Sequence, residues 1–279
     1  MATRPAAVAG SWYPASAGAL AREVDDYVGR ATGIPGGAID AIIAPHAGIM
    51  FSGPIAAYSY KAAAAHEYDV AVLVGPSHFA HFDGIALFPQ GEFATPFGGA
   101  AIDDEAARSL SQAGIIKPFP APHAREHSLE MQLPFLKRLL PNVRIVPLLM
   151  GDQNRRTIEA LAEALTTAAL PRTLLVASTD LSHYFDATAA AKLDGAVIER
   201  VEQFDAEGLL DLFESYPASE RGRNVGCGIG PALSVMLAAR ARGARQSRVL
   251  KYGHSGEVSG DYGGVVGYMA AAMGNFHAH

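Results

Sequence analysis

Three continuous apolar runs along the chain each lead into a histidine. They are residues 42–44 before His46, residues 70–74 before His78 and residues 174–178 before His183. The runs are unbroken instead of alternating, and segments with helical periodicity lie between them. This order predicts an α/β fold whose central, mainly parallel sheet is buried on both faces by flanking helices. In open α/β sheets, ligands bind outside the carboxyl ends of the strands, so the histidines indicate a functional site at one edge.

The remaining pattern extends this alternation over the whole chain. Helices are expected over residues 16–29, 53–65, 104–112, 129–139, 157–170, 188–204, 205–216 and 231–242. Further strands are expected over residues 84–88, 115–119, 143–150, 247–252 and 263–271. Leu20, Val24 and Tyr27 share one face of the first helix. No Pro/Ser-rich linker or run of charges interrupts the series, so we expect a single domain over residues 1–279.

The amino-acid composition excludes several classes of protein. The 279 residues are 49% hydrophobic and 18% charged, which supplies enough apolar material for a large core. The formal net charge of −6 argues against a nucleic-acid-binding surface, because such a surface needs clustered Lys and Arg. A single cysteine, Cys227, excludes an intrachain disulfide. No apolar run reaches the roughly 18 residues of a membrane span, and the N-terminal stretch lacks the apolar core of a signal peptide. We therefore expect a cytoplasmic protein without nucleic-acid or membrane partners.

His46, His78 and Cys227 form the first candidate set, because all three stand on glycine-flanked loops. Imidazole and thiolate are good ligands for divalent iron, copper or zinc, and three protein ligands leave coordination positions open for chemistry. The alternative is structural: each histidine bonds the backbone of its turn, and the cysteine is a small buried residue. A nucleophilic pair of cysteine and histidine is a further alternative. The shared placement at strand ends favours the metal site.

Asp180 and His183 form the second candidate set, three residues apart after a strand. A carboxylate that orients a histidine is the usual arrangement of a general acid or base. The alternative is that Asp180 caps the next turn and leaves His183 exposed. Glu126, His127 and Glu130 form a third cluster. In it, His127 can enter the site, whereas the charge of Glu130 also suits the first turn of the following helix.

Other sequence signals point to no further chemistry. Residues 75–78 lack the Gly-x-Ser-x-Gly pattern of the α/β-hydrolases. The sequence has no Walker loop, and the glycines at 226, 228 and 230 have the wrong spacing for a dinucleotide fingerprint. Trp12, the only tryptophan, is expected to pack against the body of the fold.

Motifs spread over nearly the whole chain resemble those of the Memo family, whose prokaryotic members often carry the label AmmeMemoRadiSam system protein B. The matching stretches lie, in order, at residues 10–14 (GSWYP), 44–48 (APHAG), 52–53 (SG), 75–78 (GPSH), 126–134 (EHSLEMQLP), 178–183 (STDLSH), 227–228 (CG), 259–261 (SGD) and 265–268 (VVGY). Together they are far more specific than any one alone.

This resemblance implies a fold and a site. The family is related to class III extradiol dioxygenases, which use Fe(II) and O2 in an α/β fold. Its metal-ligand pattern falls on His46, His78 and Cys227, and the dioxygenase acid–base histidine falls on His183, with Asp180 beside it. Those dioxygenases have a carboxylate where Cys227 stands, which argues against ring cleavage. The expected pocket residues are His127, Glu130, Ser77 and Phe79, the last in place of a second histidine that family members often have.

Three functions are weighed on this basis. The first is a redox metalloenzyme that activates O2 beside a small organic substrate, with His183 moving protons. The second is a binding module that uses a vestigial dioxygenase-like pocket to hold a peptide or phosphorylated ligand. The third is a non-redox zinc enzyme. The complete set of site residues favours the first, with Fe(II) as the expected metal, copper next and zinc third. The resemblance also implies functional partners encoded with a radical SAM protein.

Overall fold

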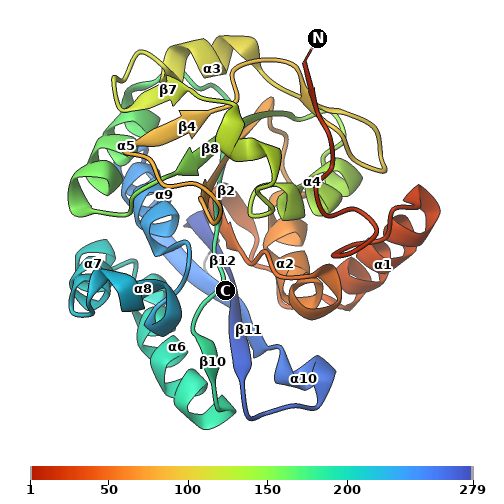
Figure 1. Cartoon of the computed structure of the whole chain (residues 1–279), viewed down its shortest axis with the longest axis vertical. Coiled ribbons are helices and arrows are strands. Elements are labelled where there is room, and N and C mark those ends of the chain that lie inside the picture. Colours follow the sequence, from red (N-terminus) through yellow and green to blue (C-terminus); the bar gives the residue numbers. More distant parts are fainter. Residues whose placement is uncertain (1, 278–279) are drawn as a thin grey trace.

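The computed structural model describes residues 2–277 as helices packed on both faces of a central sheet (Figure 1). The strands are β1 (Thr3–Arg4), β2 (Gly37–Ala44), β3 (Val70–Pro76), β4 (Ile85–Leu87), β5 (Glu92–Phe93), β6 (Ala100–Ala101), β7 (Ile116–Pro118), β8 (Arg144–Met150), β9 (Thr173–Ser178), β10 (His183–Phe185), β11 (Gln246–His254) and β12 (Val265–Phe276). The helices are α1 (Ala17–Arg30), α2 (Ile49–Ala63), α3 (Asp104–Leu110), α4 (Leu133–Leu139), α5 (Arg155–Thr167), α6 (Ala187–Glu202), α7 (Ala206–Glu214), α8 (Ala218–Asn224), α9 (Ile229–Ala241) and α10 (Gly256–Ser259), with short 3-10 turns η1 (Ala121–Ala124) and η2 (Glu130–Gln132).

The large sheet is parallel at its centre, antiparallel pairs flank this centre on both sides, and the edge strand β7 is again parallel to β4. Its strand order is β10-β12-β2-β9-β3-β8-β4-β7, and β11 also pairs with β12. The neighbours from β2 through β9 and β3 to β8 are all parallel. Strand β12 is antiparallel to β2, β10 and β11, and β4 is antiparallel to β8. The predicted α/β class with a central sheet flanked by helices is confirmed, although the sheet as a whole is mixed.

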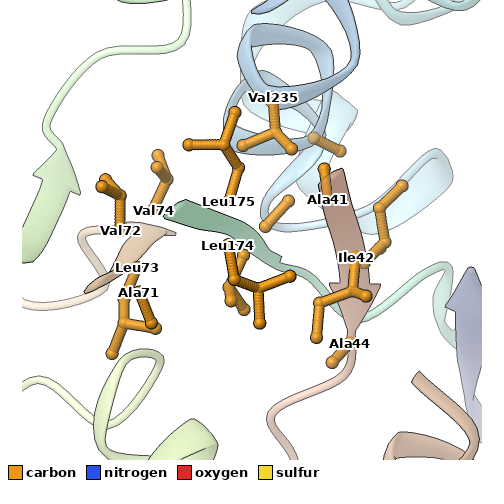
Figure 2. Packing of buried hydrophobic residues seen from close by; sticks show 14 of the residues in the cluster. Ala41, Ile42, Ala44, Ala71, Val72, Leu73, Val74, Leu174, Leu175 and Val235 are labelled. Carbon is orange, nitrogen blue, oxygen red and sulfur yellow. The ribbon is translucent and has the colours of Figure 1, made fainter. Parts of the chain in front are cut away.

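The central strands are covered on both faces, which explains their unbroken apolar sequences. Helix α9 packs on β9 and β3 from one side, and α2 packs on β2 and β12 from the other. Figure 2 shows side chains of successive residues, such as Leu174 and Leu175, leaving β9 on opposite faces into apolar surroundings. A strand buried in this way has no solvent face, so polar residues do not alternate with apolar ones.

Several boundaries differ from the pattern-based expectation. Helix α2 begins at Ile49, four residues before the expected start at residue 53. Pro54 lies inside the helix and does not mark its start. Ser128 does not cap a helix: its hydroxyl donates to the carbonyl of Pro76, and α4 starts only at Leu133 after a 3-10 turn. Helix α8 was not expected at all, because none of its residues is buried and it therefore has no apolar periodicity.

The sheet topology places the three histidine-bearing strand ends side by side. Strands β2, β9 and β3 are adjacent and parallel, and they end at Ala44, Ser178 and Pro76. The loops that follow them therefore start from one edge of the sheet, as the sequence predicts. Separately, none of the helices within residues 2–277 is both long enough and apolar enough to cross a membrane.

Candidate metal centre

His46, His78 and Cys227 converge on one point at the carboxyl edge of the sheet. One ligand atom from each lies within 4.8 Å of the others. The Cys227 Sγ is 3.2 Å from the His46 Nε2, and the two imidazole centroids are 5.3 Å apart. These residues come from three segments that are far apart in sequence, so only the fold brings the donor atoms together.

The loop that carries Cys227 is held tightly against the end of β9. A Cβ on Gly228 would lie 2.2 Å from the carbonyl oxygen of Ser178, so only glycine permits this approach. The Gly228 N–H donates to the hydroxyl of Thr179 at 2.9 Å. On the other side, the Gln153 amide donates to the Cys227 carbonyl at 2.7 Å. Backbone packing thus fixes the position of the sulfur.

The hydrogen bonds around Ser178 determine which nitrogen of His46 is free. The Ser178 hydroxyl gives its single proton to the carbonyl of Ser128, and it accepts from the Gln132 amide. Its remaining contact, 2.8 Å from the His46 Nδ1, must therefore be accepted from an Nδ1–H. The Nε2 lone pair is left facing the sulfur, which is the tautomer that a metal ligand requires.

Glu126 has the same effect on His78. Burial alone would raise the pKa of Glu126, but hydrogen bonds from His78, the charge interaction with its ring and the Ser128 N–H outweigh it and lower this pKa to about 2. The ionised carboxylate accepts from the His78 Nδ1 at 2.8 Å and from its backbone N–H at 2.6 Å. The Nδ1 proton is thus fixed, and Nε2 is the nitrogen available for a metal.

Replacing Glu126 with alanine is therefore expected to weaken metal binding by about 10- to 100-fold, the usual effect of removing a carboxylate that orients a ligating histidine. The affinity can be measured by competition with a chelator of known strength. Glu163→Ala, a change at an exposed helical position, is the control and is expected to leave the affinity unchanged. Equal affinities in the two variants would contradict the role of Glu126.

Burial sets the resting charge of the three candidate ligands. It lowers the pKa of His46 far below its usual value, and it raises the pKa of the Cys227 thiol, to which the charge of Asp180 adds. Without a cation nearby, the thiol proton is held between Sγ and the His46 Nε2. A divalent ion can replace that proton, since it binds thiolate and neutral imidazole together.

Asp180 supports the His46 loop instead of orienting His183. Its carboxylate accepts from the His46 N–H at 2.7 Å. Burial raises the pKa of Asp180 to about 7, although the N–H groups of His46 and Ala47 lower it in part. Within residues 2–277, no hydrogen bond joins this carboxylate to His183, whose Nδ1 is buried without a partner. The expected Asp–His pair is therefore not formed, because the carboxylate points to the backbone after β2.

The three candidate ligands open into a cavity of about 510 Å³. Aromatic rings form part of its wall: the His127 ring stacks on that of His78 with centroids 4.5 Å apart, and the Trp12 ring lies 4.4 Å from His127 at an angle of 51°. The lining residues are Trp12, His46, Ala47, His78, His127, Asp180, His183, Tyr184, Gly222, Arg223, Cys227 and Val266. A volume of this size suits a small organic molecule.

Three expected pocket residues lie elsewhere. Glu130 is fully buried, forms an ion pair with Arg4, and accepts from the N–H groups of residues 7 and 8 and from the Tyr13 hydroxyl. Ser77 closes a turn by donating to the Ala80 carbonyl, so its hydroxyl faces its own loop. Phe79 does not line the cavity, but its exposed ring packs edge-on against His127 at 5.8 Å.

Other cavity residues were not identified from the sequence. Trp12 lines the cavity instead of only packing on the body of the fold, and its conspicuous Gly-Ser-Trp-Tyr-Pro setting was the signal that could have revealed it. Tyr184 and Val266 are brought in by the pairing of β10 with β12, which no local pattern predicts. Gly222 and Arg223 belong to α8, the helix that has no apolar face.

Comparisons with known proteins agree with this architecture. A family model described as Memo-like protein matches residues 4–272. A MEMO1 family protein of Methanopyrus kandleri is 37% identical over 282 residues, covering 96% of this chain and 97% of the relative. A MEMO1 family protein of Methanobrevibacter smithii is 34% identical over 281 residues, covering 95% and 97%. The crystal structure of an uncharacterized protein from Escherichia coli K12 has a TM-score of 0.58 at 13% identity, covering 85% of this chain and 100% of that one, and thus shares the fold.

Proposed function

The chain belongs to the Memo family, and we propose that it is a metal-dependent oxidoreductase whose ion is held by His46, His78 and Cys227. The observation that carries the proposal is the preset tautomer of both imidazoles. Ser178 and Glu126 hold the two Nδ1 protons, so that both Nε2 lone pairs are free next to the sulfur. A structural pair of histidines would not need this arrangement, whereas a metal site does.

The donor set can hold a redox-active ion. One thiolate and two neutral imidazoles suit iron, copper and zinc, and a site with three protein ligands leaves positions open. Iron(II) is the first expectation, copper the second and zinc the third. Iron or copper bound here would supply the one-electron and O2 chemistry that amino-acid side chains lack.

The surrounding residues provide the remaining functions of an active site. Burial lowers the pKa of His183, which lines the cavity, so its imidazole is neutral near pH 7 and can accept a proton from a substrate. Asp180 fixes the loop that carries His46 through its backbone. Trp12 and His127, whose rings are tilted by 51°, give the cavity an aromatic wall against which a substrate can pack.

Elemental analysis tests this proposal. Protein purified without oxygen and reconstituted with Fe(II) or Cu is expected to retain about one metal ion per chain and to consume O2 in the presence of a reductant. His46→Ala is expected to lose both properties, whereas His123→Ala, a change to a buried histidine outside the cavity, is expected to keep them. Bound zinc without O2 uptake, or no retained metal under any loading condition, would contradict the proposal.

A further inference from the structure

Arg223 is a cation at the cavity that the metal chemistry does not use. It lies on α8 and lines the cavity together with its neighbour Gly222. Among the lining residues within the described part of the chain, it is the only lysine or arginine. The permanent positive side-chain charge of the wall is therefore that of Arg223.

The guanidinium group of Arg223 is held against an aromatic ring and forms no ion pair with a residue that the structure describes. Its Cζ lies 4.6 Å from the centre of the Phe185 ring, so the group stacks on an aromatic face. Stacking restricts the plane of the guanidinium and leaves its N–H donors free at the edge. No carboxylate within residues 2–277 forms an ion pair with it, although the protein carries 28 acidic residues. An arginine in this state is ready to bind an anion.

The other features of the wall define the kind of anion. Trp12 provides an aromatic face for a planar ring, and His127 lies beside it with its ring tilted by 51°. Asp180 is the acidic residue of the wall, and its oxygens accept backbone N–H groups. The single cation of the wall can balance one negative charge, whereas a dianion such as a phosphate monoester would leave charge uncompensated beside Asp180. The planar fork of arginine also matches the planar carboxylate in two parallel hydrogen bonds.

We propose that Arg223 is the anchor for the carboxylate of a small aromatic acid, with the ring of this substrate packing against Trp12. The inference rests on the proposed function only in treating the cavity as its substrate site. It identifies the substrate class as a planar monocarboxylic acid.

Calorimetric titration of the purified full-length protein with benzoate and with benzamide tests the anchor. The two probes share a ring and differ in charge. Wild-type protein is expected to bind benzoate about tenfold more tightly or better, since a hydrogen-bonded charge is worth at least that factor. Arg223→Gln is expected to remove this difference. Arg240→Gln is the matched control, because Arg240 stacks on Phe204 at the same 4.6 Å but lies outside the cavity.

Each outcome decides the assignment. Equal binding of the two probes to wild-type protein at millimolar concentrations, or a preference that survives in Arg223→Gln, would overturn it. Tighter binding of phenyl phosphate than of benzoate would overturn the carboxylate class. Metal content is measured in the same samples, so that failure of the two proposals can be distinguished. A protein that retains no metal under any loading condition but still prefers benzoate refutes the redox proposal alone, and a metal-loaded protein without the preference refutes the anchor alone.

Discussion

Replacing Cys227 with alanine is expected to lower the affinity of the site for iron or copper by more than about 100-fold. Loss of a residue that only orients a ligand costs about 10- to 100-fold, and Cys227 supplies a donor atom itself. Thiolate is also the ligand that favours soft or borderline ions over magnesium and calcium. The measurement is a chelator competition under anaerobic conditions, together with the loss of sulfur-to-metal charge-transfer absorption.

Ser234→Ala is the matched control for this change. Ser234 is buried on α9, the helix that follows the Cys227 loop, and its hydroxyl donates to the Ile158 carbonyl outside the cavity. This variant is expected to bind metal as the wild type does. If Cys227→Ala kept wild-type affinity and absorption, the sulfur would not be a ligand, and the three-residue centre would have to be abandoned.

Replacing Glu130 with alanine is expected to reduce the free energy of unfolding by about 3–5 kcal/mol, although this residue lies outside the cavity. Its carboxylate is the ionic partner of Arg4, whose side chain is only 2% exposed. The change would leave the guanidinium charge buried without a counter-ion. It would also remove the acceptor for two backbone N–H groups and for the Tyr13 hydroxyl. Chemical denaturation followed by circular dichroism measures the effect.

The control for this second change is an ion pair that water can reach. Arg30 and Asp26 form such a pair on α1, with both side chains more than 60% exposed. Asp26→Ala is expected to change the free energy of unfolding by less than about 1 kcal/mol, because solvent screens exposed pairs. Similar denaturation midpoints for Glu130→Ala and Asp26→Ala would show that the buried ion pair contributes little.

The part of the site that could be predicted from sequence is the part encoded by local patterns. Unbroken apolar runs mark strands buried on both faces, and a parallel arrangement places their carboxyl ends together. His46 and His78 follow such runs directly, so their proximity could be deduced. Cys227 follows no strand, and its glycine-rich loop together with the family resemblance indicated its place.

The remaining features depend on contacts between distant segments. Whether Glu126 or Glu130 lies near the cavity depends on the position of the N-terminal segment. Arg4 forms an ion pair with Glu130, and His78 hydrogen-bonds to Glu126. Nothing in the local sequence distinguishes these two glutamates. Asp180 was expected to orient His183, but the turn after β9 brings its oxygen to the backbone of His46. Arg223 was missed because the exposed helix α8 has no hydrophobic periodicity.

The pairing of β12 has a consequence for cooperativity. One part of this strand forms the antiparallel ladder with β2, which leads to His46, and most of its length pairs with β11. Opening β11 therefore exposes amides of the same strand that holds the parallel core in place. Strands β11 and β12 and the centre of the sheet therefore belong to one unfolding unit. Local opening of β11 is expected to destabilise the folded conformation of the loop that carries His46 as well.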